Sequence, residues 1–198
     1  FAIVAATEAL ADSKLNLDNI NKQRVGVLVG SGIGGLSTIE AQIRSLVNKG
    51  PNRVAPLTIP MSISNIASGA IAIKFGLLGS SFSITSACAS STHCIGEAYR
   101  NIKDGYSDII FAGGSEASIC EFGISSFQSL TALSKSEDRN RASIPFDLNR
   151  NGFVMGEGAG VLILEELESA LKRGAKIYCE IVGYGTTSDA YPVSYTHL

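Results

Sequence analysis

The sequence contains no tryptophan, only two histidines and few charged residues, and these shortages exclude several classes of protein. With 17% charged residues and a formal net charge of −2, the chain is not expected to bind nucleic acid. No apolar run reaches the roughly 18 residues of a membrane helix, so no membrane partner is expected. The four cysteines form no Cys-x-x-Cys pair, which argues against a metal cluster or a disulfide framework and favours the reducing cytoplasm: Cys88, Cys94, Cys120 and Cys179.

Glycine and apolar residues are plentiful by contrast. The chain has 21 glycines and 45% hydrophobic residues among its 198 residues, enough for the core of a single large domain or for most of a bipartite protein. It has no starting methionine, and residues 1–6 have the pattern of a helix interior. We therefore expect the chain to begin within a domain.

Continuous apolar stretches alternate with helical patterns along the chain. Strands are expected at 24–29, 81–86, 108–112, 160–165 and 177–184, and helices at 1–13, 36–48, 62–75, about 88–103 and 166–173. Such alternation predicts an α/β fold whose sheet is covered on both faces. Because the order of elements is too irregular for a simple doubly wound sheet, we expect a mixed sheet.

The stretch from Ser83 to Thr92 passes from an apolar strand to the start of a helix, with Cys88 at the junction. Its small neighbours permit a sharp turn and the close approach of another molecule. A helix start offers unpaired N–H groups and the positive end of the helix dipole, which stabilise a thiolate. We predict that Cys88 is a nucleophile; the alternative is a buried structural cysteine.

A second motif, Gly30-x-Gly32-x-x-Gly35, follows a strand and precedes a helix, as in dinucleotide-binding proteins. That fingerprint needs an acidic residue about 20 positions later, at the end of a second strand. The sequence there, 49–53, has neither. A nicotinamide-dependent oxidoreductase is therefore the least favoured reading, and Ile33 at the tip of the turn suits an alkyl chain better than a phosphate.

Two neighbours of Cys88 on its predicted helix are poor partners for it. His93 lies five residues later and points about 140° away, so it is not a good general base and is expected to pack or to face solvent. Cys94 is also off the face of Cys88 and is expected in the core.

Several carboxylates could be catalytic or structural. Glu116, after Gly113-Gly114, could act in catalysis or accept hydrogen bonds within a turn. Asp147, Arg150 and Glu157 could form a structural ion-pair network.

The segment 86–90, preceded by Gly79 and the strand 82–84, resembles the nucleophile motif of the β-ketoacyl synthases. Other segments resemble further motifs of that family in the same order and with similar spacing: 30–35, 112–117, 145–147 and 152–160. The resemblance is to the elongating synthase II type of bacterial fatty acid synthesis, and it covers residues 1 to about 191.

The resemblance implies a thiolase-like fold, in which two similar halves stack as α-β-α-β-α layers; this chain would supply the N-terminal half only. Cys88 would be acylated by an acyl carrier protein thioester, without a cofactor. Malonyl carrier protein would then lose carbon dioxide, and the resulting carbanion would attack the acyl-enzyme. The backbone N–H of Cys88 would form half of an oxyanion hole.

The resemblance also implies binding residues. Ile33 and Phe127 match positions that line the acyl pocket, and Arg53 matches a basic position that docks the acidic carrier protein. Asn52 and Thr131 stand where further basic residues would be expected. Members of the family are homodimers.

The family's second half supplies two histidines, a lysine and a phenylalanine loop, none of which occurs in this chain. Residues 1–191 are therefore expected to be a partial N-terminal domain that is inactive alone, and 192–198 a non-native tail whose His197 is not catalytic. Two related alternatives stay open: a ketosynthase of a polyketide pathway, and a non-catalytic chain-length-factor-like partner, a kind of subunit that usually lacks the cysteine.

Overall fold

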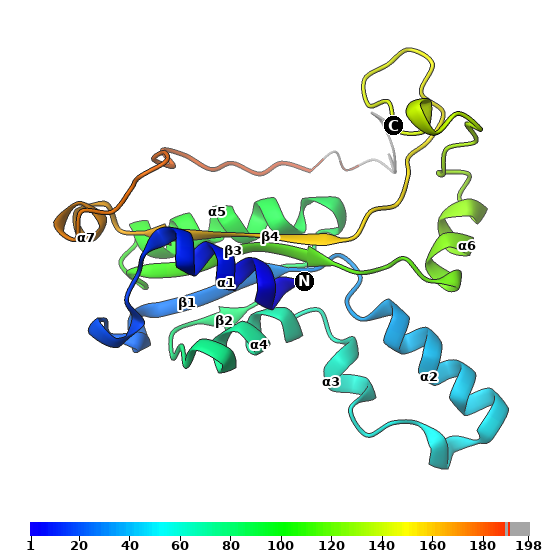
Figure 1. The fold of residues 1–198 in the computed structure, drawn as a ribbon, viewed down its shortest axis with the longest axis horizontal. Helices are drawn as coiled ribbons and strands as arrows, with labels where there is room; N and C mark the ends of the chain where they lie inside the picture. Colours follow the sequence, from blue (N-terminus) through cyan, green and yellow to red (C-terminus); the bar gives the residue numbers. More distant parts are fainter. Residues whose placement is uncertain (189, 191–198) are drawn as a thin grey trace.

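The computed structural model describes residues 1–188 and residue 190, and the described residues contain a four-stranded mixed sheet (Figure 1). The strands lie in the order β2-β1-β3-β4: β2 is Ser81–Phe82, β1 Val25–Gly30, β3 Ile109–Glu116 and β4 Gly158–Glu165. β1 runs parallel to both β2 and β3, whereas β4 is antiparallel to β3. The predicted mixed sheet is confirmed, whereas the tail 192–198 lies outside the described residues.

Helices cover both faces of this sheet. α1 (Ala2–Ser13) and α4 (Ile66–Phe75) pack on one face, and α5 (Ser90–Lys103) packs on the other (Figure 1). Side chains alternate along the strands, so one set meets α1 and α4 and the other meets α5. The first set includes Val25, Val27, Val29 and Phe111, which pack with Ile71 of α4; the second includes Leu28, Ile110 and Ala112, which pack with Cys94 and Ala98 of α5. Burial on both faces explains why β1 is an unbroken apolar run.

Other helices lie outside the sheet. Near the carboxyl ends of β1 and β3, three of them project away from it (Figure 1): α2 (Leu36–Lys49), α3 (Thr58–Ser62) and α6 (Glu121–Ser129). α7 (Leu167–Lys172) follows β4. Short 3₁₀ turns occupy Leu17–Asn19, Lys22–Arg24, Pro51–Arg53, Ala87–Ala89 and Arg139–Arg141. Within the described residues, no helix combines the length and apolarity that crossing a membrane requires.

The helix expected over 62–75 is wrong at its start, because the chain forms two helices, α3 and α4, separated by residues 63–65. The carbonyl of Ser62 accepts a hydrogen bond from the N–H of Gly35, which lies far away in the sequence. Ser64 and Asn65 favour turns over helix interiors because their side chains compete for backbone groups. A tertiary contact therefore helps to divide what the local pattern joined.

The strand expected over 81–86 is shorter than predicted, and the strand expected over 177–184 is wrong. After Phe82, whose carbonyl accepts a hydrogen bond from the buried Ser68 hydroxyl, the chain leaves the sheet. Residues 177–184 form no strand: they pair with none of the four described strands, and a surface cavity separates residues 177–182 from β4. β3, conversely, continues to Glu116 because β4 pairs with it that far.

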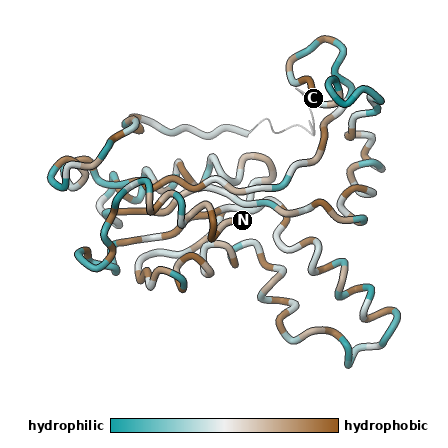
Figure 2. Tube along the Cα trace, viewed as in Figure 1, coloured by the Kyte–Doolittle hydropathy of each residue, from teal (hydrophilic) through white to brown (hydrophobic). Residues whose placement is uncertain are grey.

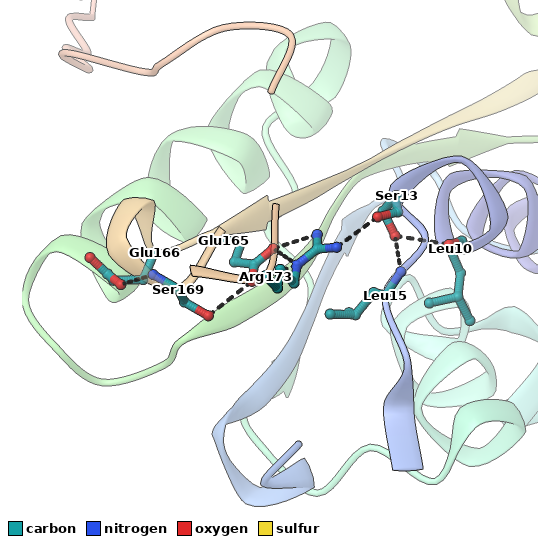
Figure 3. A network of polar contacts seen from close by, with 7 residues as sticks. All are labelled: Leu10, Ser13, Leu15, Glu165, Glu166, Ser169 and Arg173. Carbon is teal, nitrogen blue, oxygen red and sulfur yellow. Dashed lines mark hydrogen bonds and ion pairs between the residues drawn. The ribbon is translucent and has the colours of Figure 1, made fainter. Parts of the chain in front are cut away.

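A polar network ties the end of β4 and α7 to α1 (Figure 3). The guanidinium of Arg173 bonds both carboxylate oxygens of Glu165, at 2.7–3.0 Å, and donates to the carbonyl of Ser13 at 2.9 Å. Ser169 donates to Glu165, and the carboxylate of Glu166 caps the start of α7. Arg173 therefore fixes segments that are 160 residues apart in the sequence.

Candidate active site

Cys88 lies in the 3₁₀ turn Ala87–Ala89, which runs directly into α5. Its thiol-bearing side chain is exposed. The predicted position at the start of a helix is thus confirmed, and the alternative of a buried structural cysteine is wrong for this residue. We call residues 85–90 the elbow.

The elbow is strained at Ala87, whose φ of 50° places it in the left-handed region. A residue with a Cβ pays roughly 1–2 kcal/mol for this conformation, and such strain is concentrated at functional sites. Ser90, which is buried, closes the turn: its hydroxyl accepts from the N–H of Ser86 at 2.9 Å and donates to the carbonyl of Ala87 at 2.7 Å. The sequence pattern of small residues indicated a sharp turn but did not single out Ser90.

Cys94, six residues after Cys88, has a different environment. It is fully buried against the sheet with Leu28 and Ala98. Burial raises the pKa of this thiol, an effect only partly opposed by a weak hydrogen bond to the carbonyl of Ile84. The prediction that Cys94 is a core residue is confirmed.

His93 contacts an aromatic ring. Its imidazole lies edge-on to Tyr184, with ring centroids 6.3 Å apart. The same tyrosine ring lies under the guanidinium of Arg100, at 4.8 Å, and against the surface of α5 that Gly96 leaves open. The structure thus gives His93 the packing role that its position on the helix predicted.

The glycine turn that follows β1 lies against the elbow. The hydroxyl of Thr85 donates to the carbonyl of Ser31 at 3.1 Å. A Cβ on Gly32 would lie 3.3 Å from the carbonyl oxygen of Ala87, so glycine permits the close approach. Ile33, at the tip of the turn, is 42% exposed.

The amides of this turn are engaged within the protein. Gly32 N–H donates to the carboxylate of Glu116 at 2.8 Å, Gly34 N–H to the hydroxyl of Ser31 at 2.8 Å, and Gly35 N–H to the carbonyl of Ser62. A pyrophosphate would need these donors and would be repelled by the carboxylate. The geometry therefore disfavours the dinucleotide reading.

Phe127, on α6, packs edge-on against Phe153, with ring centroids 5.3 Å apart. The sequence predicted no helix there; the thiol of Cys120 accepts from Gly123 N–H and caps α6.

Two surface cavities of the chain, between α2 and α6 and beside β4, are lined by neither Cys88, Ile33 nor Phe127. The shared acyl pocket of Ile33 and Phe127 stays a prediction.

Arg53 ends the turn Pro51–Arg53 after α2 and is exposed. Its carbonyl accepts from the hydroxyl of Ser45, and within the described residues its guanidinium makes no ion pair. Asn52 and Thr131 are exposed too. The site predicted for the carrier protein therefore offers one free positive charge from these three positions.

The network expected among Asp147, Arg150 and Glu157 is not formed as predicted. Asp147 pairs with Arg141 at 3.2 Å, and its pKa is lowered chiefly by the N–H of Asn149 and secondarily by Arg141. Arg150 donates to the carbonyl of Asp147, whereas the carboxylate of Glu157 accepts from the N–H of Ile119. The sequence showed the charges but could not show which backbone groups would take them.

A mixed, doubly covered sheet and an exposed cysteine at a strained strand-to-helix elbow together define a thiolase-like protein. The sequence model of the β-ketoacyl synthase N-terminal domain matches residues 1–170, and the chain belongs to the β-ketoacyl synthase family.

Curated relatives of the chain belong to the same family. The chain is 49% identical over 195 residues to 3-oxoacyl-[acyl-carrier-protein] synthase 2 of Synechocystis sp., covering 98% of this chain and 47% of that protein. It is 47% identical over 194 residues to the synthase 2 of Staphylococcus aureus strain N315, again covering 98% of this chain and 47% of that protein. The chain thus spans about half the length of the curated relatives it matches.

A solved structure confirms the fold. The ketosynthase of a type II polyketide system, solved with its acyl carrier protein and bound to a hexaketide, superposes with a TM-score of 0.91 at 36% identity, covering 96% of this chain and 48% of that one. The thiolase-like fold class expected from the sequence is confirmed.

Proposed function

We propose that this chain is the cysteine-bearing half of a 3-oxoacyl-[acyl carrier protein] synthase that elongates fatty acids. The observation that carries the proposal is the exposed Cys88 at the start of α5, on an elbow held by Ser90. The synthase 2 relatives at 47–49% identity support the same reaction class. We use the term complete synthase for a protein of the relatives' length that contains this chain.

The reaction has two stages. In the first, the thiolate of Cys88 attacks the carbonyl of an acyl carrier thioester, and the carrier thiol leaves with a proton. The start of α5 stabilises the thiolate, and the N–H of Cys88 stabilises the oxyanion. In the second, malonyl carrier protein loses carbon dioxide, its carbanion attacks the acyl carbonyl, and the Cys88 thiolate leaves. The product is a 3-oxoacyl thioester that is two carbons longer.

The binding residues follow the family pattern. Ile33, exposed beside the elbow, and Phe127 would line the acyl pocket, and Arg53 would meet the acidic carrier protein. We assign the complete synthase to the cytoplasm as a homodimer. Exposed apolar side chains on and beside α3 suit burial against another surface: Leu57, Ile59 and Met61.

A ketosynthase of polyketide assembly is the second candidate, favoured by the structural likeness to a type II polyketide ketosynthase. The higher identity to the synthase 2 proteins favours the fatty acid pathway. Retention of Cys88 disfavours a non-catalytic chain-length-factor-like subunit.

Alkylation of the complete synthase with iodoacetamide, or with cerulenin, at neutral pH tests the nucleophile. We expect Cys88 to be labelled well before the other three cysteines, because its side chain is exposed at the elbow, whereas Cys94 is buried and the half-buried Cys120 sulfur accepts the N–H of Gly123. Cys179, which is likewise exposed but follows no such elbow, is the matched internal control. Peptide mapping by mass spectrometry reads out the order, and equal labelling of all four cysteines would contradict the proposal.

A further inference from the structure

Glu116 is the last residue of β3 and lies beside the turn that carries Ile33. β1 and β3 pair in parallel as far as Gly30 and Gly114, so both strands finish at the same end of the sheet (Figure 1). Glu116 extends two residues beyond that pairing. We call residues 31–34 the Ile33 turn.

The Glu116 carboxylate accepts three hydrogen bonds, all from uncharged donors. One oxygen accepts from the N–H of Gly32 at 2.8 Å, and the other accepts from the hydroxyls of Ser31 and Ser118, both at 3.1 Å. Both serines are buried, at 7% and 4% exposure. The hydroxyl of Ser31 in turn accepts from the N–H of Gly34. The carboxylate thus holds the turn directly before its tip, at Ser31 and Gly32, and reaches Gly34 after the tip through the Ser31 hydroxyl.

The elbow contacts the same two residues of the turn that Glu116 binds. Thr85 donates to the carbonyl of Ser31, and Gly32 lies against the carbonyl of Ala87. The backbone on both sides of Ile33 is therefore fixed, while its side chain stays 42% exposed. A side chain on a fixed backbone makes a rigid wall for a ligand, whereas the same side chain on a loose turn would give way.

We propose that Glu116 is a positioning residue for acyl-chain selection, acting by holding the Ile33 turn against the Cys88 elbow. The inference rests on the proposed function, since Ile33 must line the acyl pocket. For this role Glu116 needs its length, one acceptor oxygen for the N–H of Gly32 and a second polar atom that can bond the two serine hydroxyls, but it does not need its charge. Glutamine could replace it, with its carbonyl accepting from Gly32 and its amide donating to the two serine oxygens. Aspartate is one methylene too short.

The test measures kcat/KM of the complete synthase for a short and a long saturated acyl carrier thioester. Ile33→Ala sets the benchmark change in the long-to-short ratio. We expect Glu116→Ala and Glu116→Asp to move the ratio in the same direction by about threefold or more, the low end of coupling between contacting residues. Glu116→Gln should stay near wild type, and Ile33→Ala with Glu116→Ala should equal Ile33→Ala alone.

Two controls separate positioning from general damage. Glu157→Ala removes a carboxylate that also accepts a backbone N–H, from Ile119, and should leave the ratio unchanged. Ser31→Ala loosens the turn while keeping Glu116, and should repeat the shift if Glu116→Ala does not fold. An unchanged ratio in Glu116→Ala and Ser31→Ala, or a Glu116→Gln protein as impaired as Glu116→Ala, would overturn the proposal. A wild-type protein without condensation activity would instead refute the proposed function, and this inference with it.

Discussion

A single buried hydroxyl, that of Ser90, holds the backbone that presents Cys88. It bonds the N–H of Ser86 on one side of the left-handed Ala87 and the carbonyl of Ala87 itself on the other. Without it, a strained residue would lose the contacts that enforce its conformation. The exposure of Cys88 therefore depends on a neighbour that carries out no chemistry.

Ser90→Ala should destabilise the complete synthase by about 1–3 kcal/mol, because it leaves backbone groups of the elbow unpaired. It should also slow the alkylation of Cys88, since the relaxed elbow no longer directs the thiol outward. Urea unfolding and iodoacetamide kinetics measure the two effects. Ser91→Ala is the matched control, because Ser91 is exposed and makes none of these bonds; equal effects of the two substitutions would refute this role of Ser90.

Residue types were predictable where the signal is local. Neighbouring positions in the sequence show the small residues around Cys88 and the directions in which His93 and Cys94 point from the helix. The structure places Cys88, His93 and Cys94 as expected. The partners of Glu116 were not predictable, because Ser31 and Gly32 lie 85 and 84 residues away. Parallel pairing of β1 and β3 brings them together, and no short sequence pattern encodes that pairing.

At the scale of elements, Arg173 links β4 and α7 to the end of α1 (Figure 3). Its carboxylate partner, Glu165, has a side chain that is only 6% exposed. An acidic group so placed depends on its cation, and removing one member of a buried pair costs more than removing a surface pair.

Arg173→Met should therefore lower the free energy of unfolding of the complete synthase by about 2–4 kcal/mol, since it leaves the Glu165 carboxylate buried and uncompensated. Arg141→Met, which removes the more exposed pair with Asp147, should cost less than about 1 kcal/mol. Urea denaturation measures the free energy of unfolding of both variants. Equal decreases in the two variants would contradict the structural role given to Arg173.

Most elements were predicted, and the errors have physical causes. Strong apolar periodicity located α1, α2, α5 and the main strands to within a few residues. α6 was missed because its glycine and serines have low helix propensity, and its start is fixed by the Cys120 cap. A strand was expected at 177–184 from composition, but a strand exists only where another strand pairs with it.

At the scale of the whole molecule, the chain exposes many large apolar side chains. On α2, on α3 and just before α3 they comprise Ile43, Leu46, Val47, Leu57, Ile59 and Met61. Figure 2 shows hydrophobic positions interspersed with hydrophilic ones along the projecting α2. Contiguous exposed apolar surface in a protein marks an interface with other segments or partners. The chain also spans about half the length of its curated relatives. Both facts support the proposal that it functions within a larger assembly.

The 198-residue chain alone should therefore show no condensation and no decarboxylation of malonyl carrier protein. The elbow and Cys88 are present, but the family resemblance implies that the groups that drive loss of carbon dioxide come from the second half of the fold. Release of labelled carbon dioxide from malonyl carrier protein measures this step, with the complete synthase as the positive control. Iodoacetamide labelling of Cys88 in the same sample shows whether the elbow has formed. If the isolated chain released carbon dioxide at a rate comparable with that of the complete synthase, residues within 1–198 would supply the decarboxylating groups. That result would contradict the assignment of these groups to the second half of the fold.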